Sequence, residues 1–163
     1  TNLLLVERNI YLSKTIIIDN FLSKIECDNL INYYKENEKF SKQWRDVYPL
    51  SCNLKNIKSK LNVVSKQYKA EVDWFEIVKR PIGSKQNLHF DDAKKNTVLS
   101  SITYLNDDFK GGQTYFEEGT IFKPKMGSSL FFDGQYYRHG VKSVEENIRY
   151  VVAAWYKKLD PIS

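Results

Sequence analysis

The sequence is short of several residue types and patterns, and each shortage excludes a class of protein. It has only two cysteines, Cys27 and Cys52, which are too few for a disulfide framework and lack the spacing of a cysteine metal site. No apolar run approaches the length of a membrane-spanning helix. The first eight residues lack the pattern of a signal peptide, although the start at Thr1 leaves room for a segment removed upstream. We therefore expect a cytoplasmic protein with two reduced thiols and no membrane partner.

The excess of positive over negative charge is also modest, and glycine and proline are few. The net charge is +5, from 25 basic and 20 acidic residues. Much of the excess is lysine, which predicts a solvated helix face and leaves an acidic partner as the alternative. The chain has 7 glycines and 4 prolines, with no linker, repeat or low-complexity tract. The 163 residues are therefore expected to form a single domain. The lysines of the predicted solvated helix face are Lys55, Lys58, Lys60, Lys66 and Lys69.

Two helices are predicted within about residues 1–70. Ser23 and Glu26 have the spacing of a capping box, in which both side chains satisfy free backbone amides at the start of a helix. This helix is expected to end near Glu36 and to bury Ile25, Leu30 and Tyr33 or Tyr34. A second helix is predicted over about residues 54–70. Residues 15–19 indicate a short buried strand, and residues 44–51 a loop with a possible short strand. The second helix rests on apolar residues at helical spacing, namely Leu54, Ile57, Leu61, Val64 and Tyr68.

The rest of the chain has the pattern of short strands separated by turns. Gly111-Gly112 and Gly127 are expected in turns that need a positive φ. Helices followed by seven or eight strands, without strand–helix alternation, predict a mainly β protein with N-terminal helices. The expected fold is a double-stranded β-helix, or jelly roll, over about residues 71–157, with the helices packed on one sheet. The predicted strands cover residues 72–80, 97–105, 113–117, 120–123, 128–132 and 148–156, with another around His139.

Histidine is scarce as well, and both histidines lie at positions that suit a metal site. His89 and Asp91 form a His-x-Asp pair, whose one-residue gap puts both side chains on one side of an extended chain. With His139 arriving from a different strand, they would form a facial triad of two histidines and one carboxylate. Such a triad holds non-haem Fe(II) and leaves positions open for O₂ and a substrate. His-x-Asp alone is a weak signal. Because no other histidine exists, we predict that these three residues form the metal site and the catalytic centre.

Several motifs in order resemble the Fe(II)- and 2-oxoglutarate-dependent dioxygenases, and most closely their branch of prolyl 4-hydroxylases and oxygen-sensing prolyl hydroxylases. The resemblance covers about residues 72–157. It is more specific than the His-x-Asp pair because the motifs recur at family-like intervals. They are His89-Phe90-Asp91, Tyr104-Leu105-Asn106, Gly111-Gly112-Gln113-Thr114, Pro124-Lys125-Met126-Gly127, Phe131-Phe132, His139-Gly140-Val141, Arg149 and Trp155.

The resemblance implies roles for three more residues. Arg149, ten positions after the second histidine, would pair with the far carboxylate of 2-oxoglutarate, which its planar fork can bind with two parallel hydrogen bonds. Tyr104 would help to hold the same carboxylate, and Trp155 would wall the pocket. Each residue has a simpler reading: a surface ion pair, a half-buried aromatic residue and core packing, respectively. Further candidates for the pocket wall, or for plain core, are Phe131, Phe132, Ile102 and Val152.

Departures from the family pattern bear on the substrate. Where many prolyl hydroxylases have two tyrosines, this chain has Lys79 or Arg80 and Gln86. Asp91 favours hydroxylation over halogenation, because halogenating relatives lack the carboxylate. Relatives that dealkylate nucleic acids carry a second arginine where this chain has Trp155, so nucleic acid is not an expected partner.

The activity implied by the resemblance is hydroxylation of an unactivated C–H bond, with decarboxylation of 2-oxoglutarate to succinate and CO₂. Its cofactors would be Fe(II), 2-oxoglutarate as cosubstrate, O₂, and ascorbate as reductant. The expected substrate is a prolyl residue of a peptide or protein. The alternatives are hydroxylation of a free amino acid or another small metabolite, and a non-catalytic module that senses metal and 2-oxoglutarate. The oligomeric state does not follow from the sequence.

Overall fold

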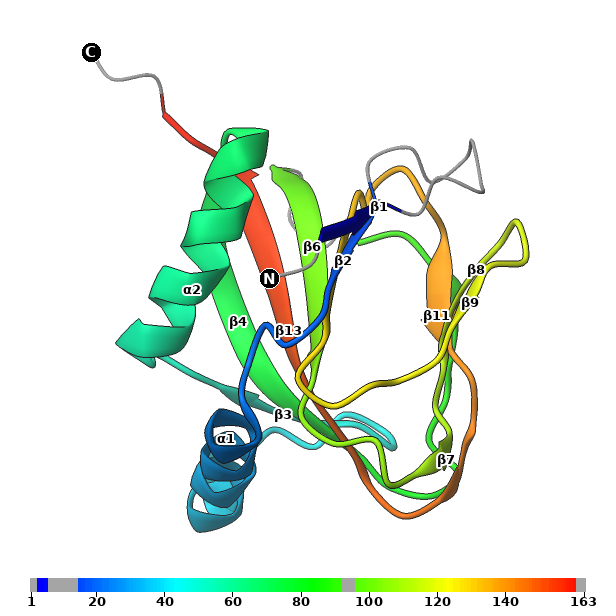
Figure 1. Ribbon diagram of the computed structural model, residues 1–163. Helices are drawn as coiled ribbons and strands as arrows, with labels where there is room; N and C mark the ends of the chain where they lie inside the picture. The colour runs from blue at the N-terminus through cyan, green and yellow to red at the C-terminus, as the bar shows by residue number, and fades with distance from the viewer. Residues whose placement is uncertain (1–2, 6–14, 92–95, 161–163) are drawn as a thin grey trace.

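Two antiparallel sheets face each other, and two helices cover the outer face of the larger sheet (Figure 1). The computed structural model describes residues 3–5, 15–91 and 96–160. In order across the larger sheet, the strands are β1 (Leu3–Leu5), β2 (Ile16–Ile18), β10 (Ser129–Phe132), β6 (Thr97–Tyr104), β13 (Arg149–Lys158), β4 (Ala70–Arg80) and β3 (Tyr48–Ser51). The smaller sheet contains β5 (Gln86–His89), β11 (His139–Val141), β8 (Thr114–Phe116) and β9 (Ile121–Phe122), and a separate pair joins β7 (Lys110–Gly111) to β12 (Val144–Glu146). This arrangement confirms the predicted jelly roll.

Helix α1 (Lys24–Glu36) begins at the predicted capping box. The Ser23 hydroxyl accepts a hydrogen bond from the Glu26 amide (3.1 Å), and the Glu26 carboxylate accepts one from the Ser23 amide (3.0 Å). The expectation that Ile25 is buried was wrong. Its side chain is 72% exposed, because the first turn presents it to solvent. The buried residues of the helix are Cys27, Leu30 and Tyr34.

Helix α2 (Lys55–Ser65) is shorter than predicted, because the chain tightens into a 3₁₀ turn, η3 (Lys66–Tyr68), before a left-handed residue at Lys69. A second 3₁₀ turn, η2 (Glu38–Phe40), follows α1. On α2 the lysines are exposed, as a solvated face requires, except that Lys60 pairs with Glu26 of α1 at 2.8 Å. Both helices lie on the same face of the larger sheet (Figure 1). The buried apolar residues of α2 are the predicted Ile57, Leu61 and Val64.

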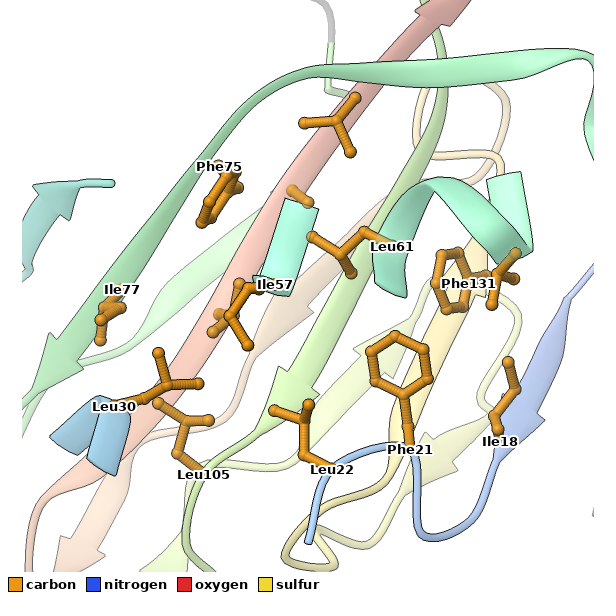
Figure 2. Packing of buried hydrophobic residues seen from close by; sticks show 14 of the residues in the cluster. Ile18, Phe21, Leu22, Leu30, Ile57, Leu61, Phe75, Ile77, Leu105 and Phe131 are labelled. Carbon is orange, nitrogen blue, oxygen red and sulfur yellow. The ribbon is translucent and has the colours of Figure 1, made fainter. Parts of the chain in front are cut away.

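The main hydrophobic core lies between these helices and the larger sheet. Figure 2 shows Leu30 of α1 and Leu61 of α2 packed over Ile77 of β4 and Phe131 of β10. Burial of this apolar surface is the dominant favourable contribution to folding. Strands β2 and β3, which precede residue 70, pair with β10 and β4. The N-terminal part and the jelly roll therefore share one sheet and one core.

Alternation along the strands divides the residues of the larger sheet between two faces. On β13, Val152 belongs to the core beneath the helices, whereas Val151 faces the smaller sheet. On β10, Phe131 faces the helices and Phe132 the smaller sheet. Of the four candidate wall residues, Phe131 and Val152 are therefore core, while Phe132 and Ile102 line the space between the sheets. The reason is the two-residue period of a strand.

The cysteines behave as the sequence predicts. Cys27 and Cys52 are free thiols, and burial raises the pKa of each to about 11. Neither is therefore a ready nucleophile or metal ligand at neutral pH. Within the described ranges, no helix is both long and apolar enough to cross a membrane.

Candidate active site

The two histidines meet on neighbouring strands of the smaller sheet. His139 of β11 is the register partner of His89 of β5. Opposite residues of an antiparallel pair project from the same face, so the imidazole rings lie together, with centroids 4.4 Å apart. Strand β5 was not among the strands that the sequence predicted, although the His-x-Asp argument required extended backbone there. The structure supplies it.

Asp91 completes the cluster from the segment that follows β5. Its backbone amide donates to the Gly134 carbonyl (2.8 Å), which holds the turn in place. The Asp91 Oδ1 atom lies 3.3 Å from His89 Nε2 and 3.2 Å from His139 Nε2. Two ligands at right angles, each about 2.1 Å from a metal, are about 3 Å apart. The three predicted residues therefore have the separation of metal ligands, and all three ligand atoms lie within 4.8 Å of one another.

Hydrogen bonds orient both imidazole rings. His89 Nδ1 lies 2.9 Å from the Asn87 carbonyl oxygen, and His139 Nδ1 lies 2.9 Å from the Tyr137 carbonyl oxygen. A carbonyl only accepts, so each Nδ1 carries the proton. In the neutral ring, the lone pair is then on Nε2, which points at the cluster. Backbone partners of this kind fix the tautomer and the ring orientation of metal-binding histidines.

The Asp91 carboxylate is held ionised. Burial raises its pKa, but hydrogen bonds from His139 and His89, which the rings donate through Nε2 when they are protonated and no metal is bound, outweigh burial and hold the pKa well below its usual range. Gly134 gives this carboxylate its room, because a Cβ there would lie 2.5 Å from Asp91 Oδ2 and 2.5 Å from Ser100 Oγ. The sequence reasoning missed Gly134. Its signal was the Asp133-Gly134 turn between two strands.

Arg149 lies at the start of β13 and is only 1% exposed. Its Nε donates to the Gly112 carbonyl (2.8 Å), and its Nη2 donates to Thr114 Oγ1 (3.3 Å). The surface ion pair considered as the alternative is excluded by this burial. The φ of Gly112 is positive, as predicted, with a value of 64°. A Cβ at this position would lie 3.0 Å from Arg149 Cδ. The guanidinium thus keeps N–H donors available for a ligand.

Tyr104 converges on the same point. Its hydroxyl shares a 2.5 Å hydrogen bond with Thr114 Oγ1, and its ring centroid lies 5.5 Å from the guanidinium carbon of Arg149. The ring also packs against Val78 and Val151, as a core aromatic residue does, and the contact of Tyr104 with the 2-oxoglutarate carboxylate stays a prediction. Thr114 joins the tyrosine to the arginine. No separate role was predicted for it, although it ends one of the family-like motifs.

One pocket of about 360 Å³ contains both the metal cluster and the Arg149 guanidinium. It lies between the sheets and is lined by the three residues of the metal cluster and by Arg149. Phe132 forms apolar wall beside the cluster, with its ring centroid 4.7 Å from that of His139. Trp155 lines the pocket as expected and stacks on Trp74, with centroids 4.6 Å apart. The volume is within the range of small-molecule sites.

The two departures from the family pattern also line this pocket. Arg80 is 6% exposed and donates to Gln86 Oε1 (2.7 Å) and to Ser84 Oγ (3.1 Å). The Gln86 amide nitrogen lies 3.3 Å from His89 Nε2. Of the two residues considered for the first departure, Arg80 therefore enters the site. Lys79 points away and pairs with Glu38.

Comparison with known proteins agrees with this geometry. Residues 64–157, more than half of the chain, match the family model of the 2OG-Fe(II) oxygenase superfamily. The chain belongs to this superfamily. Among curated members, prolyl 3-hydroxylase 2 from Homo sapiens is 40% identical over 70 residues, which are 39% of this chain and 10% of that protein. Prolyl 3-hydroxylase 1 from Gallus gallus is 39% identical over 69 residues, 38% of this chain and 9% of that protein. The match thus spans about a tenth of the length of these relatives.

Solved structures of superfamily members share the fold. The viral collagen prolyl hydroxylase from Paramecium Bursaria Chlorella virus-1, in its 2OG complex, has a TM-score of 0.74 at 22% identity, over 90% of this chain and 96% of that one. A prolyl hydroxylase from Trichoplax adhaerens, in complex with a hypoxia inducible factor oxygen degradation domain peptide fragment, has a TM-score of 0.74 at 17% identity, over 88% and 83%. The prolyl 4-hydroxylase-like resemblance read from the sequence is confirmed.

Proposed function

We propose that this chain is an Fe(II)- and 2-oxoglutarate-dependent dioxygenase that hydroxylates a prolyl residue of a peptide or protein. One observation carries the proposal: a single pocket holds the cluster of His89, Asp91 and His139 together with the buried guanidinium of Arg149. A metal site and a cation in one small cavity suit a molecule with a chelating keto acid at one end and a carboxylate at the other.

The donor set fits the proposed metal. Two imidazoles and one carboxylate with further open positions are the ligands of non-haem Fe(II) oxygenases. When bound, Fe(II) and 2-oxoglutarate would supply the activation of O₂, with succinate and CO₂ as by-products. His89, Asp91 and His139 would hold the metal. Arg149 would bind the far carboxylate, and Tyr104 would keep Thr114 and the arginine in position.

The prolyl substrate is supported by two observations. The relatives and the solved structures named above are prolyl hydroxylases, and one of them was solved with a bound peptide fragment. In addition, the pocket wall carries exposed aromatic surface, because Trp44 is 72% exposed and Phe90 is 37% exposed. Aromatic grooves are a common means of binding proline-containing peptides. The segment 44–51 contributes Trp44, Val47 and Pro49 to this pocket.

The proposal is tested by succinate formation from 2-oxoglutarate with Fe(II) and ascorbate, with and without a panel of proline-containing peptides. We expect one or more peptides to stimulate turnover, and a product whose hydroxyl position on the ring is read by NMR. The His139→Ala variant should lose this turnover while keeping the circular dichroism spectrum of the folded protein.

Other outcomes would contradict the proposal in different ways. Turnover that no peptide stimulates, but that a free amino acid does, would replace the peptide substrate by a small molecule. Tight binding of both metal and 2-oxoglutarate without any turnover would make the chain a sensor module instead of an enzyme.

A further inference from the structure

The pocket contains a second buried arginine that the proposed grip on 2-oxoglutarate does not use. Arg80 of β4 is the register partner of Arg149 of β13, so the two side chains leave the sheet on the same face. They are 6% and 1% exposed, and both line the pocket. Across the described parts of the chain, no ion pair involves either guanidinium. Two buried like charges therefore line the same pocket.

The position of Arg80 is well defined. Ser84 Oγ and Gln86 Oε1 each accept one hydrogen bond from its guanidinium, at 3.1 Å and 2.7 Å. These bonds use two of its five N–H donors. Because the Gln86 amide nitrogen is 3.3 Å from His89 Nε2, Arg80 lies one side chain away from the metal cluster. Among the described residues, no other hydrogen bond of this guanidinium is found, so its other donors are available to a ligand in the pocket.

No carboxylate of the pocket neutralises Arg80 directly. Burial and the charge of Arg149 lower its pKa to about 10, although Asp46 acts in the opposite direction. Asp46 is partly exposed and accepts a hydrogen bond from the Lys85 amide at 3.3 Å. Glu76 also lines the pocket, but it is four residues away along β4, about 13 Å, and burial raises its pKa. A buried charge is costly unless it is paired, so a partner from outside the chain is the natural complement.

Fe(II) and 2-oxoglutarate do not supply the negative charge that would neutralise Arg80. Fe(II) brings two positive charges and the two arginines one each, whereas Asp91 brings one negative charge and 2-oxoglutarate two. One positive charge remains after the cosubstrate binds at this end of the pocket, from which Glu76 is four residues away along β4. Arg149 takes the far carboxylate and the metal balances the near one, so the uncompensated charge is that of Arg80.

We propose that Arg80 is a specificity-determining residue that binds a carboxylate of the substrate, close to the carbon that is hydroxylated. The inference rests on the proposed function and narrows its substrate to an acidic molecule. The carboxylate has two sources: an acidic residue beside the proline of a peptide, or the carboxylate of free proline. The net charge of +5 favours the approach of either one.

The test measures binding by calorimetry to protein loaded with Mn(II) and 2-oxoglutarate in the absence of O₂. The ligands form two matched pairs. The first pair is a blocked tetrapeptide with glutamate beside proline and the same peptide with glutamine. The second pair is free proline and prolinamide. For the member that carries the carboxylate, we expect a Kd lower by about tenfold or more in one of the pairs, because a charge-assisted bond to arginine is lost in the amide. The pair that shows the preference identifies the source.

Arg80→Gln should abolish this preference and leave the Kd of 2-oxoglutarate, measured without substrate, within about threefold of the wild type. Arg80→Lys, which keeps the charge, should retain part of the preference and guards against a folding defect. Lys79→Gln is the matched control. It removes the same charge from the neighbouring position of β4, where the side chain pairs with Glu38 outside the pocket.

Three results would overturn the inference: equal binding of acids and amides by the wild type, a preference that survives in Arg80→Gln, or a large loss of 2-oxoglutarate affinity in that variant. The last result would assign Arg80 to the cosubstrate instead. Failure of the wild type to bind 2-oxoglutarate would overturn the proposed function itself, so the two failures are distinguishable.

Discussion

The two faces of the larger sheet differ in what they bury, although the same strands form both. The outer face packs apolar side chains against α1 and α2, and residues such as Val152 and Phe131 have no polar group to satisfy. The inner face bounds the pocket and buries two arginines without ion pairs among the described residues. Moving one residue along a strand thus changes the role of a side chain from stabilising the fold to binding a ligand. Substitutions on the two faces should therefore have separable effects.

The largest separable effect is expected for Arg149→Ala. The variant loses two charge-assisted hydrogen bonds to the cosubstrate, so the Kd of 2-oxoglutarate should rise about 100-fold or more. Calorimetry on the Mn(II)-loaded protein measures this change. Arg149→Lys keeps the charge but loses the planar fork, and its loss should be smaller. Unchanged affinity in the alanine variant would remove Arg149 from the site.

Gly134→Ala should act on the metal rather than on the cosubstrate. The added Cβ displaces the Asp91 carboxylate, so the Kd of Mn(II) should rise about 10- to 100-fold, as for other residues that support a metal ligand. Gly119→Ala is the control, since it strains the backbone at φ 110° but meets no atom within 4 Å. The comparison fails if both alanine variants weaken Mn(II) binding equally.

Phe131→Leu and Phe132→Leu compare the two faces at adjacent positions. Both side chains are fully buried, so each variant should lower the free energy of unfolding in urea by about 1–2 kcal/mol. Only Phe132→Leu should also weaken Mn(II) binding, because its ring lies against His139. Equal Mn(II) affinities for the two variants would show that the faces are not functionally separate here.

Ser23→Ala should have the smallest effect and should be confined to the outer face. Removing the capping hydroxyl leaves the Glu26 amide without its partner, which should cost about 1 kcal/mol of unfolding free energy. The Kd values of Mn(II) and 2-oxoglutarate should match those of the wild type. A change in either would reveal coupling between α1 and the pocket.

Local sequence patterns predicted the elements with strong periodicity or capping. The start of α1, the end of β4 at Arg80 and the turn at Gly112 all follow from residue preferences within a few positions. Ile25 was misplaced because helical spacing alone does not say which side of the first turn the sheet occupies. The short strands β1, β5, β7 and β12 were missed, because two to four residues carry little periodicity and depend on their partners.

The sequence by itself determined the candidate residues of the site: two histidines, one Asp at the right gap, and an arginine ten residues after the second histidine. Residue types and local spacing are properties of the chain, so they can be read without coordinates. Only the tertiary structure decided that His89 and His139 are register partners, that Thr114 joins Tyr104 to Arg149, and that Arg80 shares their pocket. These contacts join strands that are far apart in sequence, and strand pairing across a sheet is set by the packing of the whole core.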